Sequence, residues 1–190
     1  MARRLIDEFD QADAEFIILN SAGCGAYMKE YVHLLADDPV YAEKAKSFSS
    51  RVKDITEFLI EKGWRKPLTG EAISVTYHEP CHLVHTQKIS QAPRDLIKNI
   101  PDIEYCELPE SSWCCGSAGI YNITRYDDSM KILERKMNNI AITGVSYVVT
   151  GNPGCMIQLM YGRKKFKVDV EILHPISLLN RAYKKERAEK

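Results

Sequence analysis

The chain has 190 residues, of which 45% are hydrophobic, and its 26 basic residues balance 26 acidic ones. This length suffices for one sizeable core, so one domain is the default expectation. The zero net charge gives no reason to expect nucleic acid as a partner. The sequence has no run of roughly 18–20 apolar residues that would span a bilayer, and its N-terminus lacks the apolar region of a signal peptide. We therefore expect a cytoplasmic protein whose thiols are kept reduced.

Short β-rich runs alternate with longer amphipathic runs along the chain. An N-terminal helix precedes a strand at 15–20 and helical structure through 27–35, and one long helix is predicted from about 39 to 64. Further strands are predicted at 72–77, 103–108, 145–150 and 169–173, with helices at 92–100, 127–142, 156–162 and 174–183. This alternation predicts an α/β protein with a mainly parallel sheet flanked by helices on both faces.

Five of the six cysteines follow the carboxyl end of a predicted strand: Cys24, Cys81, Cys114, Cys115 and Cys155. The carboxyl ends of parallel strands lie on one edge of a sheet, where ligands bind, so we expect a thiolate-lined site there. Cys24 and Cys155 also stand near predicted helix N-termini, where the helix dipole favours the thiolate. The alternative is that small turn residues simply gather where strands become helices. The sixth cysteine, Cys106, falls within a predicted strand, and we expect it to be a small buried hydrophobe.

The spacing of these cysteines favours an iron–sulfur cluster over zinc. Zinc sites usually show two pairs of cysteines two to four residues apart, whereas this chain has isolated cysteines and one adjacent pair, Cys114 and Cys115. Adjacent cysteines close a disulfide only through a strained ring, so we do not expect a structural disulfide between Cys114 and Cys115. Iron–sulfur clusters accept four thiolates from separated loops.

Four histidines lie beside the same segments and are weaker ligand candidates. His82 and His85 follow Cys81 closely, while His78 and His174 stand at the ends of predicted strands. A metal-ligating role is open for all four, because imidazole is a common ligand. We expect instead that His78 and His174 donate hydrogen bonds within the cleft.

Three segments carry a resemblance to a known family: YHEPCHL, CCGSAG and TGNPGC. In that order and at these separations they resemble the cysteine-rich CCG domain of the glycolate oxidase iron–sulfur subunit and its lactate-utilisation relatives, a domain similar to one in heterodisulfide reductase. The resemblance implies a [4Fe–4S] cluster, cubane or noncubane, held by Cys81, Cys114, Cys115 and Cys155, with Cys24 as a further candidate. The family's full motif has a fifth cysteine, and this chain has Gln158 at that position. Loss of the cluster in aerobic preparations is also expected.

Two domain divisions are compatible with the pattern. Residues 1–190 form a single CCG domain, or the end of a first repeat (about 1–65) precedes a complete second repeat (about 66–190). The second division is favoured by a weak internal echo, in which Asn20 to Cys24 and Asn152 to Cys155 share the order strand, Asn, small residue, Gly-Cys, helix.

The resemblance implies an electron-transfer module of a hydroxyacid-oxidising complex. The chain has no ferredoxin-type cysteine run and no glycine fingerprint for flavin or nicotinamide, so we do not expect it to oxidise glycolate or lactate alone. The implied partners are a flavin-containing hydroxyacid dehydrogenase subunit and a ferredoxin-type iron–sulfur domain or subunit, with electrons passing to quinone or another acceptor at the inner face of the membrane. Two alternatives are a thiol-disulfide enzyme that uses Cys114 and Cys115, and a cluster-free docking module.

Overall fold

The computed structural model describes residues 1–189, and their strands form two parallel sheets. The larger sheet contains β3 (Ile73–Tyr77), β4 (Ile103–Tyr105), β5 (Tyr147–Val149) and β6 (Glu171–Leu173), in the order β4–β3–β5–β6. The smaller sheet pairs β1 (Ile17–Leu19) with β2 (Val52–Asp54). Neighbouring strands run parallel in both sheets, so the chain must cross over between them, and helices supply the crossovers.

The helices follow in chain order. They are α1 (Ala2–Gln11), α2 (Ala22–Lys29), α3 (Tyr31–Leu34), α4 (Ala42–Arg51), α5 (Ile55–Lys62), the π-helix η1 (His82–Thr86), α6 (Gln91–Lys98), α7 (Tyr121–Thr124), α8 (Tyr126–Thr143), α9 (Pro153–Lys165) and α10 (Pro175–Ala188). Among residues 1–189, no helix is both long and apolar enough to cross a membrane.

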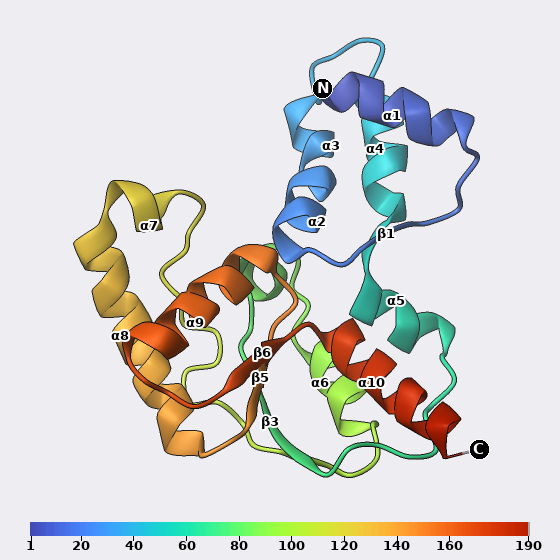
Figure 1. The fold of residues 1–190 in the computed structure, drawn as a ribbon. Coiled ribbons are helices and arrows are strands. Elements are labelled where there is room, and N and C mark those ends of the chain that lie inside the picture. Colours follow the sequence, from blue (N-terminus) through green and yellow to red (C-terminus); the bar gives the residue numbers. More distant parts are fainter. Residues whose placement is uncertain (190) are drawn as a thin grey trace.

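Helices cover both faces of the four-stranded sheet (Figure 1). On one face, Leu133 of α8 and Leu159 of α9 pack in a core with Val148 of β5. On the other face, residues of α6 and α10, such as Leu178, pack in a second core with Val149. The consecutive residues Val148 and Val149 belong to opposite cores because side chains alternate across a strand. The predicted fold class, a parallel sheet with helices on both faces, is confirmed.

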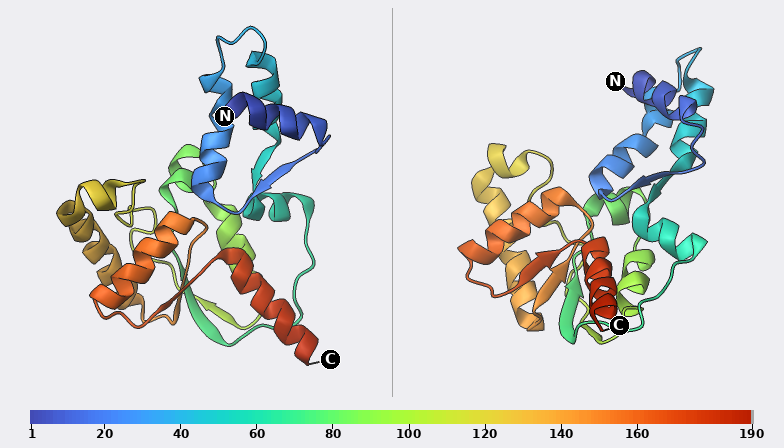
Figure 2. Two further views of the ribbon diagram at one scale, coloured as in Figure 1. Left: turned by 45° about the horizontal axis from the view of Figure 1, so that its top comes forward. Right: turned by 45° about the vertical axis from the view of Figure 1, so that its right-hand side comes forward.

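Residues 1–54, called here the N-terminal part, have a core of their own. It includes Ile6, Ile17 and Val52, and the rings of Tyr31 and Phe48 stack in it with their centroids 5.5 Å apart. Figure 2 shows this part standing at one end of the four-stranded sheet in both views. Whether the chain is better divided into two repeats stays a prediction.

The predicted long helix from 39 to 64 is wrong, because a strand interrupts it. Val52 pairs in register with Ile17, and its side chain is buried in the N-terminal core. Asp54 then caps α5, since its carboxylate accepts a hydrogen bond of 2.9 Å from the backbone N–H of Thr56. The helical spacing of Val52, Ile55 and Phe58 concealed this break, because three residues are too few to show the alternation of a strand.

The first predicted strand lies in a different sheet from the others. β1 pairs with β2 and not with the four-stranded sheet, so Cys24 does not share a sheet edge with the other loop cysteines, contrary to the prediction. The two parts nevertheless meet where the strands end. The backbone N–H of Ala22 donates a hydrogen bond of 3.0 Å to the carbonyl of Gly151, just beyond β5.

Candidate metal centre

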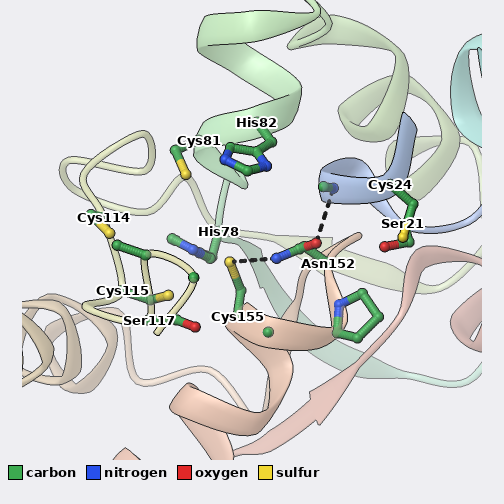
Figure 3. A pocket seen from close by; sticks show the side chains of 15 residues that line it. Ser21, Cys24, His78, Cys81, His82, Cys114, Cys115, Ser117, Asn152 and Cys155 are labelled. Atoms are coloured by element: carbon green, nitrogen blue, oxygen red, sulfur yellow. Dashed lines mark hydrogen bonds between the residues drawn. The ribbon is translucent and has the colours of Figure 1, made fainter. Parts of the chain in front are cut away.

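A cavity of about 370 Å³ lies at the carboxyl ends of β3 and β5, and five cysteines line it. Figure 3 shows four of them on one side: Cys81, Cys114 and Cys155 around His78, with Cys115 beside Cys114 and Ser117. Cys24 lines the opposite side, beyond Asn152. Every loop cysteine that the sequence singles out therefore faces one cavity, although these residues are spread along most of the chain. The further lining residues are Ser21, Gly23, His82, Ala118, Gly119, Pro153 and Gly154.

Cys81 is held by the turn that follows β3. Glu79, in this turn, is buried and accepts hydrogen bonds from Arg94 at 2.7 Å, from Ser90 at 2.5 Å and from Ser111 at 2.9 Å. Burial alone would raise the pKa of Glu79, but these donors hold it below its ordinary value, so the carboxylate stays charged. Because Ser111 belongs to the loop that leads to Cys114, the hydrogen bonds of Glu79 connect two cysteine-bearing loops.

Gly116 sets the conformation of the loop that contains Cys114, Cys115 and Gly116, called here the CCG loop. Its φ of 91° lies in the left-handed region, and a Cβ there would stand 2.6 Å from the carbonyl oxygen of Ser129. In this conformation the Gly116 N–H points at the sulfur of Cys114, 3.3 Å away. The Ser129 hydroxyl holds the loop from the other side by donating a 2.7 Å hydrogen bond to the Gly116 carbonyl.

Cys155 lies in the first turn of α9, where Asn152 supports it. The Asn152 side chain donates to the Cys155 sulfur at 3.4 Å and accepts from the Gly23 backbone N–H at 3.2 Å, as Figure 3 shows. The N-terminus of this 13-residue helix adds partial positive charge near the sulfur. Asn152 thus connects the N-terminal part to a cavity thiol. In the sequence Asn152 stands out only as part of the internal echo, which does not indicate this role.

The four clustered thiols shift one another's pKa values. Cys115 and Cys81 act as donors to Cys114, which lowers the pKa of Cys114, and Cys115 together with the neighbouring His78 lowers that of Cys155. The donors show the opposite effect: the pKa values of Cys81 and Cys115 are raised because they keep their protons beside sulfur and are removed from water. Opposite pKa shifts are expected when neighbouring thiols compete for protons.

A buried lysine that was not predicted as a site residue lies behind this cluster. Lys136 of α8 is 0% exposed, and its ammonium donates to the carbonyl of Glu110 at 2.5 Å. Burial lowers its pKa to about 8, and the nearby Cys115 and Glu110 oppose that change. A signal was present, since Lys136 lies three residues after Leu133 and next to Met137 on the buried face of the predicted helix.

The histidines differ sharply in their surroundings. His174 caps α10: its Nδ1 accepts from the Ile176 N–H at 3.2 Å, so Nε2 carries the proton and donates to the Asn20 carbonyl at 2.9 Å. The predicted hydrogen bonding by His174 is thereby confirmed, but His174 is not among the residues that line the cavity. His78 is 1% exposed, yet neither of its ring nitrogens has a hydrogen-bond partner among residues 1–189, so that prediction was wrong. His82 is exposed at the rim, and His85 does not line the cavity.

Gln158, at the position of the family's fifth cysteine, points away from the cavity. Its side chain is 3% exposed; it donates to the Ser129 hydroxyl at 3.2 Å and accepts from the Asn122 side chain at 3.0 Å. Because Ser129 in turn holds the Gly116 carbonyl, Gln158 braces the CCG loop from behind.

Cys106 is less buried than predicted, and Cys115 is buried although it lies in a loop. Cys106 lies just beyond β4 and is only half-buried, because the strand ends at Tyr105, although the Cys106 N–H still bonds to the Val75 carbonyl at 2.9 Å. Cys115, although it lies in a loop, is 2% exposed and belongs to the core under α8 and α9. The glycine-bearing loop folds inward against that core, which sequence spacing does not reveal.

The donor set fits an iron–sulfur cluster. Four sulfurs from three loops converge with a buried imidazole that has no hydrogen bond, and the cavity has room for a group much larger than one metal ion. One imidazole nitrogen and the sulfurs of Cys115 and Cys155 lie within 4.8 Å of one another. Thiolates are the usual protein ligands of such clusters.

Comparison with known proteins agrees with this chemistry. Residues 75–160 match the model of the CCG cysteine-rich domain family, so the predicted resemblance is confirmed. The chain is similar to the probable glycolate oxidase iron-sulfur subunit of Bacillus subtilis, with 39% identity over 183 residues, covering 94% of this chain and 41% of that protein. The glycolate oxidase iron-sulfur subunit of Escherichia coli is 31% identical over 176 residues, with 93% and 42% covered. Lactate utilization protein A of Lysinibacillus sphaericus is 28% identical over 182 residues, with 94% and 78% covered. The chain thus spans less than half of either glycolate oxidase relative.

Proposed function

We propose that this protein is an iron–sulfur electron-transfer module of a glycolate- or lactate-oxidising complex. The observation that carries the proposal is the gathering of Cys81, Cys114, Cys115 and Cys155 at one cavity beside a sheet edge. The names of the similar proteins, glycolate oxidase iron-sulfur subunit and lactate utilization protein A, support the same function. When bound, a [4Fe–4S] cluster supplies one-electron transfer.

The residues around the cavity prepare it for a negatively charged group. Asn152 and the Gly116 N–H donate to sulfur, which stabilises thiolates, and α9 directs its N-terminus at Cys155. Lys136 adds a cation behind Cys115, out of contact with water. Cys24 stays a further ligand candidate at the rim. Together these groups would favour the reduced, more negative state of a bound cluster.

The proposed partners are a flavin-containing hydroxyacid dehydrogenase subunit, which would supply electrons, and a ferredoxin-type iron–sulfur domain or subunit on the route to quinone or another acceptor. Such a module would work in the cytoplasm or at the inner face of the membrane through these partners. Anaerobic reconstitution with iron and sulfide tests the core of the proposal. We expect visible absorption that dithionite bleaches and air destroys; a protein that binds no iron under these conditions would refute it.

A thiol-disulfide exchange enzyme is the second candidate, and the state of Cys114 favours it. This thiol is half-buried, next to Cys115, and its pKa is lowered, which favours the thiolate that disulfide exchange requires. Reduction of a mixed disulfide by the iron-free protein, lost in Cys114→Ser, would support this function. Retention of iron with no exchange activity would favour the electron-transfer module.

A further inference from the structure

Among the described residues that line the cavity, His78 is the buried one whose side-chain polar atoms all lack a hydrogen-bond partner. It is 1% exposed, and both Nδ1 and Nε2 lack a hydrogen bond within residues 1–189. Buried polar groups in folded proteins nearly always have a partner, and each exception calls for an explanation. An imidazole withdrawn from water beside four thiols therefore indicates that a ligand is its partner.

The backbone fixes His78 in this position. Its N–H donates a 2.9 Å hydrogen bond to the Val149 carbonyl, which continues the pairing of β3 with β5 by one residue. The carboxylate of the next residue, Glu79, accepts a 2.7 Å hydrogen bond from Arg94 of α6. Figure 3 shows the ring of His78 between Cys81, Cys114 and Cys155. A ring nitrogen lies within 4.8 Å of the sulfurs of Cys115 and Cys155, a spacing that a bound metal can bridge.

The side chain at the fifth position of the family motif is not free to bind. Both ends of the Gln158 amide are engaged, by Ser129 and Asn122, on the far side of the CCG loop. The other histidines are also unsuitable: both ring nitrogens of His174 make hydrogen bonds, and His82 is exposed at the rim. His78 is thus the remaining buried donor that faces the sulfurs.

We propose that His78 is the fifth protein donor of the cluster and binds one of its irons through a ring nitrogen. This inference rests on the proposed function. The ring nitrogen of the neutral imidazole that carries no proton donates its lone pair to iron, and no electron is gained or lost; the other nitrogen keeps the single proton of the ring. Because an imidazole brings no negative charge, in contrast to a thiolate, His78 ligation raises the reduction potential of the cluster, as histidine ligands do in other iron–sulfur centres.

Pulsed EPR of the reconstituted full chain, prepared with ¹⁴N- or ¹⁵N-histidine, tests this proposal. We expect the strong nitrogen coupling of a directly bound imidazole, with the isotope shift that identifies histidine. The coupling should disappear in His78→Cys, which keeps a ligand at the same place and should retain iron with a more negative midpoint potential. The matched control His82→Ala, at the rim of the same cavity, should keep both the coupling and the potential.

The outcomes separate this inference from the proposed function. A parent protein that holds iron and sulfide but shows only weak nitrogen coupling, or whose coupling survives in His78→Cys, refutes His78 ligation and leaves the electron-transfer module intact. A parent that assembles no cluster refutes both.

Discussion

The two Asn-to-Cys loops, residues 20–24 and 152–155, have the same order of residues and different surroundings. Each follows a parallel strand, begins a helix and contributes a cysteine to the cavity. Cys155 is 4% exposed and belongs to the chain of interacting thiols, whereas Cys24 is exposed at the opposite side of the cavity. A shared local pattern therefore delivers a thiol to the site. Only at Cys155 do neighbouring loops add further thiols beside it.

The largest expected effect comes from removing one thiol of this pair at a time. Cys155→Ser should lose most of the iron after reconstitution, because one of four clustered sulfurs is gone, and should cost about 1–3 kcal/mol without iron because a hydroxyl is buried. Cys24→Ser should keep its iron and change stability by less than about 0.5 kcal/mol. Iron analysis and denaturant unfolding measure both. Equal iron loss in Cys24→Ser would make Cys24 a ligand and erase the difference between the loops.

A second test concerns the CCG loop, whose thiols lie beside Cys155 and not beside Cys24. Gly116→Ala should destabilise the iron-free protein by more than about 2 kcal/mol, since it combines left-handed strain with a Cβ 2.6 Å from the Ser129 carbonyl. Gly119 also has positive φ, at 68°, but an added Cβ there meets nothing within 4 Å. Gly119→Ala should therefore cost only the strain, about 1 kcal/mol. Similar unfolding free energies for the two variants would contradict the close packing of the loop.

A third, smaller effect is expected at the asparagines that begin the two loops. Asn152→Ala removes hydrogen bonds to Cys155 and from Gly23, so it should cost about 1–2 kcal/mol and loosen the contact with the N-terminal part. Asn20 is exposed, and its described contact uses the backbone carbonyl, so Asn20→Ala should stay within about 0.5 kcal/mol. Hydrogen exchange at the Gly23 amide locates the loosening. An unchanged exchange rate in Asn152→Ala would rule out the bridging role.

The smallest effect is a pH dependence at the first loop. Burial lowers the pKa of His174, which bonds the Asn20 carbonyl while it is neutral. The unfolded state then binds a proton more readily, so stability contributed by neutral His174 is present above the unfolded pKa of about 6.5 and declines as pH falls towards the lower folded value. His174→Asn keeps a helix-capping side chain without the titration, and its unfolding free energy should decline less between these values. If the unfolding free energies of the parent and of His174→Asn declined equally as pH falls, the pH dependence would come from groups other than His174.

Much of the architecture could be predicted from the sequence, because strands and amphipathic helices alternate over most of the chain. The failure at Val52 arose because a three-residue strand has too little alternation to be distinguished from a helix. The placement of β1 in a separate sheet could not be predicted either, since strand partners depend on long-range packing. Cys106 was misjudged for a local reason, as β4 ends one residue before it.

The site was partly predictable for a topological reason. Loops that follow parallel strands converge, which is why Cys81, Cys114, Cys115 and Cys155 could be singled out together. The roles of Asn152, Lys136 and Gln158 could not be predicted in the same way, because each depends on contacts between distant segments. The exposure of Cys24 and the burial of Cys115 also follow from how loops fold against the cores.

The most direct test of the central claim compares two cysteines of similar burial. Cys114 and Cys106 are both half-buried, but only Cys114 lines the cavity. Cys114→Ser and Cys106→Ser should therefore have similar melting temperatures without iron, and iron and sulfide per chain should be measured after anaerobic reconstitution. If the cavity thiols hold the cluster, Cys114→Ser loses most of its iron while Cys106→Ser matches the parent; full iron in Cys114→Ser, or its loss in Cys106→Ser, would contradict this account.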